Sequence, residues 1–177
     1  DYDIQKTLDE QSKTKATINN VSQRFEIDED KASSWGTQKG VWEAYRFESL
    51  MYHADITIAD AKPGQIFEIQ FDKNLDFTQY SSDFPKIKNK DGIDIADPYF
   101  DYKTNLLTYV FNSNAPNADV IASLEIKGII PSKFYAKNSG DYYFTIEVGP
   151  GMDINTGNPK IDNQKITAYY DTYDRQT

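Results

Sequence analysis

Apolar and polar residues alternate at every second position in several separate segments, and this pattern constrains the fold more than any other feature of the sequence. In residues 50–58 the apolar residues fall mainly on the even numbers, and in residues 66–72 Phe67, Ile69 and Phe71 share one face. The same period recurs in residues 120–126 and 142–148. Because successive side chains of a β-strand point to opposite faces, each segment predicts a strand with one buried face.

Turn-forming residues separate these segments and indicate the class of fold. Lys62-Pro63-Gly64, Asp91-Gly92 and residues 138–141 each lie between two predicted strands, as is typical of tight connections. Residues 106–111 are apolar on both faces, which is expected of a central strand covered on each side. The sequence therefore predicts an all-β chain that forms an antiparallel two-sheet β-sandwich with minor helix.

The period of two begins near residue 21 and divides the chain into two regions. Residues 1–20 are mostly polar, and we expect a polar tail or a loosely docked helix there. Residues 21–177 are expected to form the sandwich domain. Near Glu48-Ser49 the inward-facing positions change from odd to even numbers, which predicts a β-bulge or a strand break. The residues expected inside the sandwich are Phe67, Ile69, Phe71, Leu124, Ile126, Phe144 and Ile146.

Charge and the scarcity of cysteine and histidine exclude several classes of function. The 177 residues carry a net charge of −9, no cysteine and one histidine. An acidic chain repels nucleic-acid phosphates and anionic lipids, so we expect no nucleic acid as partner and no membrane insertion. A chain without cysteine has no thiolate ligand, and one histidine excludes a multi-histidine metal site. We therefore expect no metal, no cofactor and no enzymatic activity.

Two local features have both a structural and a functional interpretation. His53 is the only side chain suited to act as a base near neutral pH, but it lies on the polar face of an alternating segment and no Gly-x-Ser-x-Gly motif presents a nucleophile. A structural or groove-facing position is favoured over catalysis, and we include His53 among the candidate ligand contacts.

Asp153 and Asn155 place oxygen atoms at alternate positions of a Gly- and Pro-rich loop, which fits an ordinary loop or a weak calcium site.

Aromatic residues are the remaining candidates for a binding site. Trp35 and Trp42 bracket a glycine-containing segment, and Tyr169 and Tyr173 lie in the last predicted strand. Such rings either cap the core of the sandwich or stack on a sugar or peptide, because aromatic anchors dominate many binding energies. We predict a ligand-binding surface that includes these four residues. The net charge favours a neutral glycan or a basic protein patch over a sialylated or sulfated glycan.

The order of segments between residues 62 and 131 resembles that of a known family. Residues 62–77 (KPGQIFEIQFDKNLDF) are similar to the strand that follows a Gly-Asp pair in Gram-positive wall-anchored adhesins. Residues 83–111 are similar to those adhesins' Asp-Gly pair, alanine-bearing strand, Tyr-Asp turn and Thr-Tyr-x-Phe strand, and residues 117–131 to the next strand. The chain thus resembles the immunoglobulin-like ligand-binding subdomains of the MSCRAMM type, although Gly64-Gln65 replaces the usual Gly-Asp.

This resemblance implies a function at the bacterial surface. We expect an extracellular adhesin domain that binds a host protein or a host glycan, with a structural spacer or stalk as the alternative. In the family, ligand peptides dock between two adjacent subdomains, and only one subdomain fits in this chain. The chain is therefore expected to be a monomeric fragment of a longer surface protein, which is anchored to the cell wall in its full-length form.

Overall fold

The computed structural model describes residues 15–27, 37–38, 41–44, 50–78, 84–132, 140–149 and 160–168. These residues form twelve strands and no helix. The strands are β1 (Thr17–Ile27), β2 (Thr37–Gln38), β3 (Val41–Ala44), β4 (Leu50–Ala61), β5 (Ile66–Gln70), β6 (Leu75–Asp76), β7 (Ile87–Lys88), β8 (Asp94–Asp101), β9 (Leu106–Phe111), β10 (Ala118–Pro131), β11 (Gly140–Gly149) and β12 (Lys160–Ala168).

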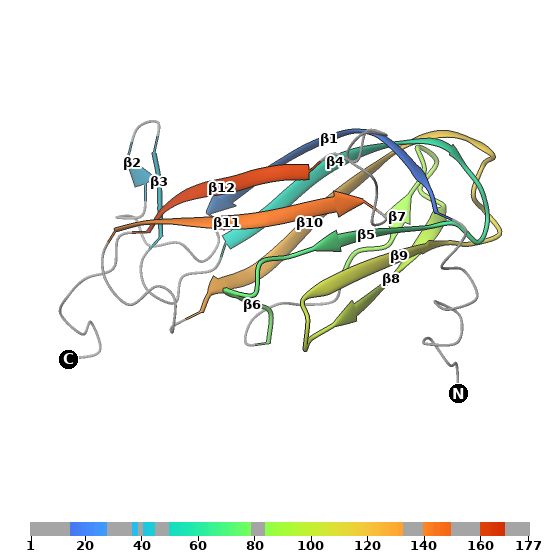
Figure 1. Ribbon diagram of the computed structural model, residues 1–177. Coiled ribbons are helices and arrows are strands. Elements are labelled where there is room, and N and C mark those ends of the chain that lie inside the picture. The colour runs from blue at the N-terminus through green and yellow to red at the C-terminus, as the bar shows by residue number, and fades with distance from the viewer. Residues whose placement is uncertain are drawn as a thin grey trace.

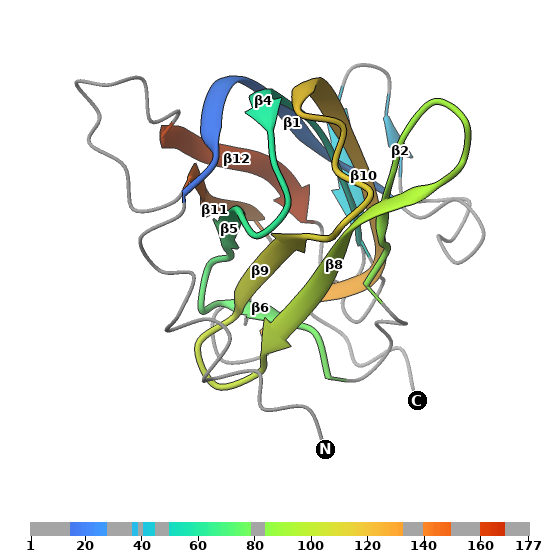
Figure 2. The ribbon, with the colours of Figure 1, turned by 90° about the vertical axis from the view of Figure 1, so that its right-hand side faces the viewer.

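The strands form two sheets that face each other as a sandwich (Figure 1, Figure 2). The small sheet has the order β1-β4-β10-β6, and the large sheet has the order β2-β3-β12-β11-β5-β9-β8-β7. Neighbouring strands are antiparallel except β3 and β12, which run parallel over two residue pairs. The predicted antiparallel two-sheet sandwich is therefore confirmed, and the short parallel pair is an addition that the sequence did not indicate.

Strand β4 lies between β1 and β10 and shows how the alternating pattern produces the small sheet. Tyr52 lies opposite Phe25 of β1 and Ile126 of β10, and all three side chains are buried. The next residue, His53, lies opposite Arg24 and belongs to the outer face. A shift of one residue would move the whole apolar row into water, so the pairing register is strongly specified.

The core lies between the two sheets and contains all seven residues predicted to be inside. Phe71, which directly follows β5, packs edge-to-face against Tyr52 of β4, with ring centroids 5.0 Å apart and an interplanar angle of 80°. The Tyr52 hydroxyl donates a hydrogen bond to Gln23 Oε1, so its polar atom has a partner although the ring is buried. The predicted core residues, each 2% exposed or less, are Phe67, Ile69, Phe71, Leu124, Ile126, Phe144 and Ile146.

Strand β9 lies between β5 and β8 in the large sheet and is buried on both faces, as its sequence predicts. Tyr109 faces the core, and Thr108 and Val110 on the opposite face are buried as well. Glu68 of β5 lies opposite Thr108. Burial raises the pKa of the Glu68 carboxyl, and the charge of Lys15 opposes this shift in part. Keeping Glu68 ionised in this place costs folding free energy, because burial disfavours the charged form.

The N-terminal boundary of the sandwich differs from the expected one. Strand β1 begins at Thr17, and Ala16 and Ile18 are buried, so the last residues of the expected polar tail belong to the sandwich. Pairing with β4 gives this segment hydrogen bonds and burial that its polar sequence does not indicate, since strand formation depends on context. The expected minor helix has no counterpart in the described ranges. Residues 1–14 and the predicted break near Glu48-Ser49 lie outside the described residues.

Candidate functional site

Three segments that are distant in the sequence meet at one end of the sandwich and enclose a hollow of about 220 Å³. They are residues 73–78, which contain β6, the turn between β8 and β9, and Ser132, which follows β10. We call this feature the loop hollow. The residues that line it include Lys73, Asp76, Thr78, Tyr102, Lys103 and Ser132.

The turn between β8 and β9 forms the first wall of the loop hollow and is closed by Asn105. Asp101 and Leu106 are the last paired residues of the two strands, and the Asn105 N–H donates to the Asp101 carbonyl over 2.8 Å. Asn105 has a φ of 58°, a left-handed conformation in which asparagine is enriched. The carboxylate of Asp101 accepts a second hydrogen bond from the N–H of Lys103, at 2.8 Å. The turn therefore has asparagine at its left-handed position and an aspartate carboxylate as acceptor for the N–H of Lys103.

Side-chain hydrogen bonds hold this turn against residues 70–75, which run from the end of β5 to the start of β6. Asn105 Nδ2 donates to the carbonyls of Leu75, at 2.8 Å, and Asp72, at 3.0 Å. In the reverse direction, Gln70 Nε2 donates to the carbonyl of Thr104 at 2.7 Å. The β8–β9 turn and residues 70–75 therefore each donate side-chain hydrogen bonds to the other.

The residue that follows β10 is connected to the same loop. The N–H of Ser132 donates to the carbonyl of Asn74 over 2.7 Å. Within the loop, Asp72 accepts from the N–H of Asn74 through Oδ1, at 2.8 Å, and from the N–H of Thr145 of β11 through Oδ2, at 2.9 Å. All three segments are therefore held in one arrangement, which lowers the entropy cost of binding a ligand between them.

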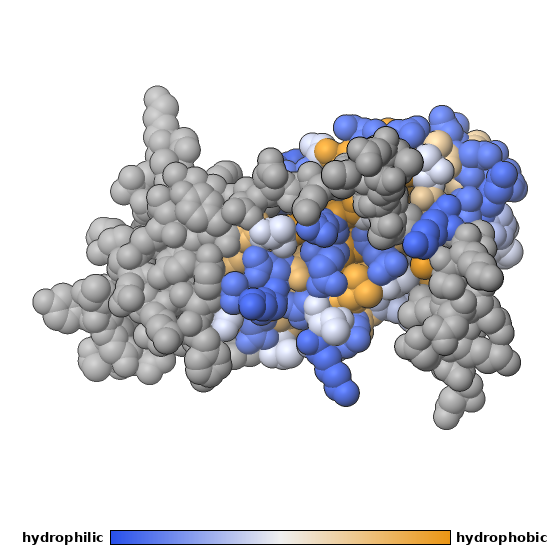
Figure 3. All heavy atoms as spheres, in the orientation of Figure 1, coloured by the Kyte–Doolittle hydropathy of each residue, from blue (hydrophilic) through white to orange (hydrophobic). Residues whose placement is uncertain are grey.

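An exposed aromatic ring lies at the rim of the loop hollow. Tyr102 is 55% exposed, and its ring packs edge-to-face against Phe100 with centroids 4.8 Å apart. Phe100 in turn stacks on Phe84, at 4.4 Å, and contacts Phe77, at 4.8 Å. Tyr102 is therefore the outer end of an aromatic row that begins in the core. On the face drawn in Figure 3, hydrophilic and hydrophobic described residues are interspersed.

Polar groups of both signs line the loop hollow beside this ring. The Asp76 carboxylate accepts hydrogen bonds from the N–H and the hydroxyl of Thr78, and the side chains of Lys73 and Lys103 carry positive charge. An aromatic face next to ammonium, carboxylate and hydroxyl groups is suited to reversible binding of a small polar ligand.

His53 belongs to a different polar cluster, on the outer face of the small sheet. Its Nε2 lies 3.4 Å from Asp55 Oδ2, and its side chain is 25% exposed. Ser123 of β10 donates a hydrogen bond to Asp55 Oδ1 over 2.6 Å. This hydrogen bond, with the nearby His53, holds the pKa of the Asp55 carboxyl below its usual value. Because the Ser123 hydroxyl bonds the carboxylate instead of the imidazole, the cluster lacks the serine–histidine contact of a hydrolytic site.

The other sequence-predicted binding residues stay predictions. Trp42 lies in β3, and only its backbone is described. Trp35, Tyr169 and Tyr173 lie outside the described residues. Of the five predicted binding residues, only His53 has a described side chain. Sequence reasoning did not select Tyr102, although an aromatic residue inside a polar hairpin turn is a signal that points to recognition.

The described residues contain neither a cluster of metal-ligating side chains nor a membrane-spanning helix. No three or more of their histidine, aspartate or glutamate side chains are grouped so as to hold a metal ion. None of their segments is a helix with the length and hydropathy needed to cross a bilayer. The possible calcium ligands Asp153 and Asn155 lie outside the described residues.

A comparison with protein families decides the identity of the fold. A family model described as a bacterial Ig domain matches residues 43–138, which is more than half of the chain. The chain is a bacterial Ig domain. The matched region includes β4 to β10 and every residue that lines the loop hollow. The hollow is therefore a feature of the Ig domain itself.

Solved structures show the same fold in two streptococcal proteins. The Ig domain is similar to the serine-rich repeat adhesion glycoprotein Srr1 of Streptococcus agalactiae, with a TM-score of 0.62 and 16% identity over 88% of this chain and 47% of that one. It is also similar to the serine-rich repeat protein Srr2 of the same organism, with a TM-score of 0.56 and 20% identity over 88% and 45%. The Ig domain thus spans slightly less than half of each of those chains. A search of curated protein sequences found no match.

The family match and the shared fold confirm the resemblance read from residues 62–131, namely that the chain is similar to the immunoglobulin-like subdomains of Gram-positive adhesins.

Proposed function

We propose that this Ig domain is an extracellular part of a bacterial surface adhesin and binds a host protein or a host glycan without catalysing a reaction. The observation that carries the proposal is the fold that it shares, over 88% of its length, with Srr1, a protein named as an adhesion glycoprotein. In the full-length protein we place the domain outside the cell, on a chain anchored to the cell wall.

The described side chains support binding more than catalysis. The loop hollow combines an exposed aromatic ring with charged and hydroxyl groups on preorganised loops, which is the usual composition of a recognition site on a rigid sandwich. His53 is the only histidine of the chain, and the nearest described carboxylate, Asp55, is bonded to Ser123. This arrangement gives no support to a hydrolytic function.

A structural spacer is the second candidate, and one observation favours it. The large apolar side chains exposed on the described surface are Ile93, Tyr102 and Ile121, and they lie on three different elements. Soluble domains that bind other proteins through apolar patches usually expose a larger contiguous area. A spacer would project neighbouring domains from the wall without contacting a ligand itself.

A binding comparison separates the two functions. The 177-residue domain is immobilised and tested against host plasma proteins, extracellular-matrix proteins and a glycan array, beside the parent protein with and without this domain. An adhesin domain is expected to bind at least one of these components saturably, and its deletion is expected to abolish binding by the parent. If deletion leaves affinity unchanged and only shortens the distance from the wall at which the parent binds, the spacer function is correct.

A further inference from the structure

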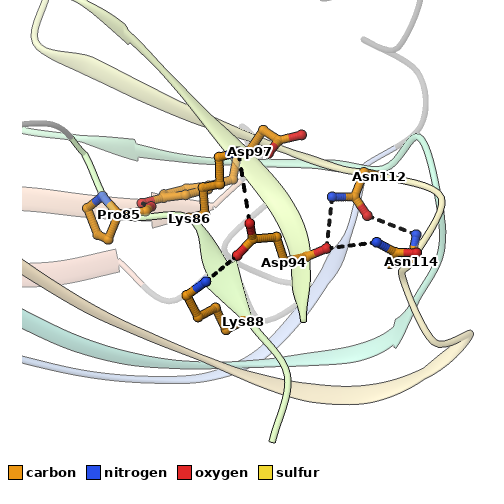
Figure 4. A network of polar contacts seen from close by, with 8 residues as sticks. Pro85, Lys86, Lys88, Asp94, Asp97, Asn112 and Asn114 are labelled. Atoms are coloured by element: carbon orange, nitrogen blue, oxygen red, sulfur yellow. Dashed lines mark hydrogen bonds and ion pairs between the residues drawn. The ribbon is translucent and has the colours of Figure 1, made fainter. Parts of the chain in front are cut away.

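The lysines of the loop hollow differ in their charge partners from those at the β7 end of β8. On β7 and just before it, Lys88 and Lys86 form ion pairs with Asp94, and Lys86 also with Asp97 (Figure 4). Within the part of the chain that the structure describes, Lys73 and Lys103 form no ion pair. The two ammonium groups of the loop hollow therefore lack a salt-bridge partner, although the Asp76 carboxylate belongs to the same lining and the net charge of the protein is −9.

The hollow also supplies an apolar face and hydrogen-bond acceptors. Tyr102 is supported from behind by Phe100, so more than half of its surface is free to contact a ligand without exposing the core. The Asp76 carboxylate also lines the hollow and has acceptor capacity beyond the two bonds from Thr78. The hydroxyl of Thr104 adds a group that can both donate and accept.

The size of the hollow limits what enters it. Its volume of about 220 Å³ is below the roughly 300–1,000 Å³ typical of pockets for drug-sized ligands. One ring-sized group fits, and the remainder of a larger ligand would lie outside. A group that matches this lining has a flat apolar face for Tyr102, hydroxyls for Asp76, and a negative charge for Lys73 and Lys103.

We propose that the loop hollow is a subsite for one saccharide ring that carries a carboxylate, such as a uronic or sialic acid unit. This inference rests on the proposed function and specifies its ligand class. It differs from the neutral glycan favoured by net charge, because a ligand carboxylate in the hollow would form direct ion pairs with Lys73 and Lys103, and contacts of this length are much shorter than the Debye length of about 8–10 Å. Net charge acts at longer range and disfavours a densely sulfated polyanion.

The proposal is tested by NMR on the 177-residue chain at physiological salt. The probes are methyl β-D-glucuronide and the methyl glycoside of N-acetylneuraminic acid, with methyl β-D-glucoside, acetate and a short polyglutamate peptide for comparison. The acidic glycosides are expected to shift the amide signals of residues 73–78 and 102–105 saturably. The neutral glucoside and acetate are expected to bind at least about tenfold more weakly, since each lacks one of the two interactions.

Matched variants assign the contacts. Tyr102→Ala and Lys103→Gln are expected to weaken binding of the acidic glycosides by about fivefold or more. Ile121→Ala and Lys90→Gln change an exposed apolar residue and an exposed lysine away from the hollow, and are expected to leave binding unchanged. Dispersed amide spectra of all four variants confirm folding.

Three results would overturn the proposal. The first is equal binding of glucuronide and glucoside, and the second is binding of polyglutamate at the hollow in place of the glycosides. The third is a host ligand for which the wild-type domain, Tyr102→Ala and Lys103→Gln have equal affinity. In that case the proposed adhesin function stands and the subsite is wrong. If the acidic glycosides bind at the hollow but the parent's affinity for host ligands does not depend on this domain, the subsite stands and the adhesin function is wrong.

Discussion

Substitutions at Asn105 separate two contributions that one side chain makes to the loop hollow. Asn105→Gly keeps the left-handed backbone accessible but removes the hydrogen bonds to the carbonyls of Leu75 and Asp72. Leaving buried carbonyls short of a partner costs about 1–3 kcal/mol. Asn105→Ala removes the same bonds and adds the left-handed penalty of about 1–2 kcal/mol for a residue with Cβ. Because glycine also gains about 0.5–1 kcal/mol of freedom in the unfolded chain, alanine is expected to be less stable than glycine by about 0.5–1 kcal/mol.

Asn117 is the matched control for the backbone contribution. It has a φ of 55° but is exposed, and its side chain makes no hydrogen bond with a described residue. Asn117→Gly is therefore expected to leave the free energy of unfolding within about 0.5 kcal/mol of wild type. The difference between Asn117→Ala and Asn117→Gly is expected to equal that at Asn105. Urea unfolding followed by circular dichroism, with linear extrapolation, gives all four free energies.

A third substitution at Asn105 makes the free energy of unfolding depend on pH. Asn105→Asp places carboxylate oxygens against two carbonyl oxygens in a buried site, so the pKa of the new carboxyl is expected to rise above its unfolded value. The variant is then most stable below the unfolded pKa of about 3.9 and loses stability as the pH rises through the folded pKa. The reasoning is refuted if Asn105→Ala lies within about 0.5 kcal/mol of wild type, or if Asn105→Asp is as stable as wild type at pH 7.

Three further predictions follow from other parts of the sandwich. Glu68→Gln is expected to raise the free energy of unfolding at pH 7, because burial raises the pKa of Glu68; the gain should disappear as the pH falls below about 4.3, and a destabilised variant at pH 7 would contradict it. Ser123→Ala is expected to raise the pKa of Asp55 towards its ordinary value in an NMR titration, with a stability change below about 1 kcal/mol because the carboxylate is exposed. Phe71→Ala is expected to lower the free energy of unfolding by about 3–5 kcal/mol in urea, and a loss below about 1.5 kcal/mol would mean that the ring is not a core element.

The fold was predictable from the sequence because its main signal is local. Whether a residue faces the core or water is fixed by alternation along one strand, and β4, β5 and β11 each show it within a few residues. The start of β1 was not predictable in the same way. Residues 17–20 are mostly polar and become a strand because β4 offers them an edge, as Thr17 opposite Ala59 illustrates. Pairing of this kind depends on tertiary context, which local patterns do not contain.

The loop hollow was not predictable because three distant segments form it. Lys73, Tyr102 and Ser132 come together only after the strand order of both sheets is known. Local ion pairing was not predictable either, because the net charge of −9 gave no indication that Lys73 and Lys103 lack ion-pair partners among the described residues. The aromatic residues that composition did suggest, such as Trp42 and Tyr169, stay predictions.

The placement of the first and last described strands has a mechanical consequence. The N-terminal end of β1 lies where Ala16 N–H bonds the carbonyl of Ile66, at 2.9 Å. The C-terminal end of β12 lies beside Gly140, at the opposite end of the sandwich (Figure 1). Tension applied between these ends pulls β1 along β4 and β12 along β11, so the ten residue pairs of the β1–β4 ladder are loaded in shear together. Rupture then requires many hydrogen bonds to fail at once, whereas a pull across the strands would open them one at a time.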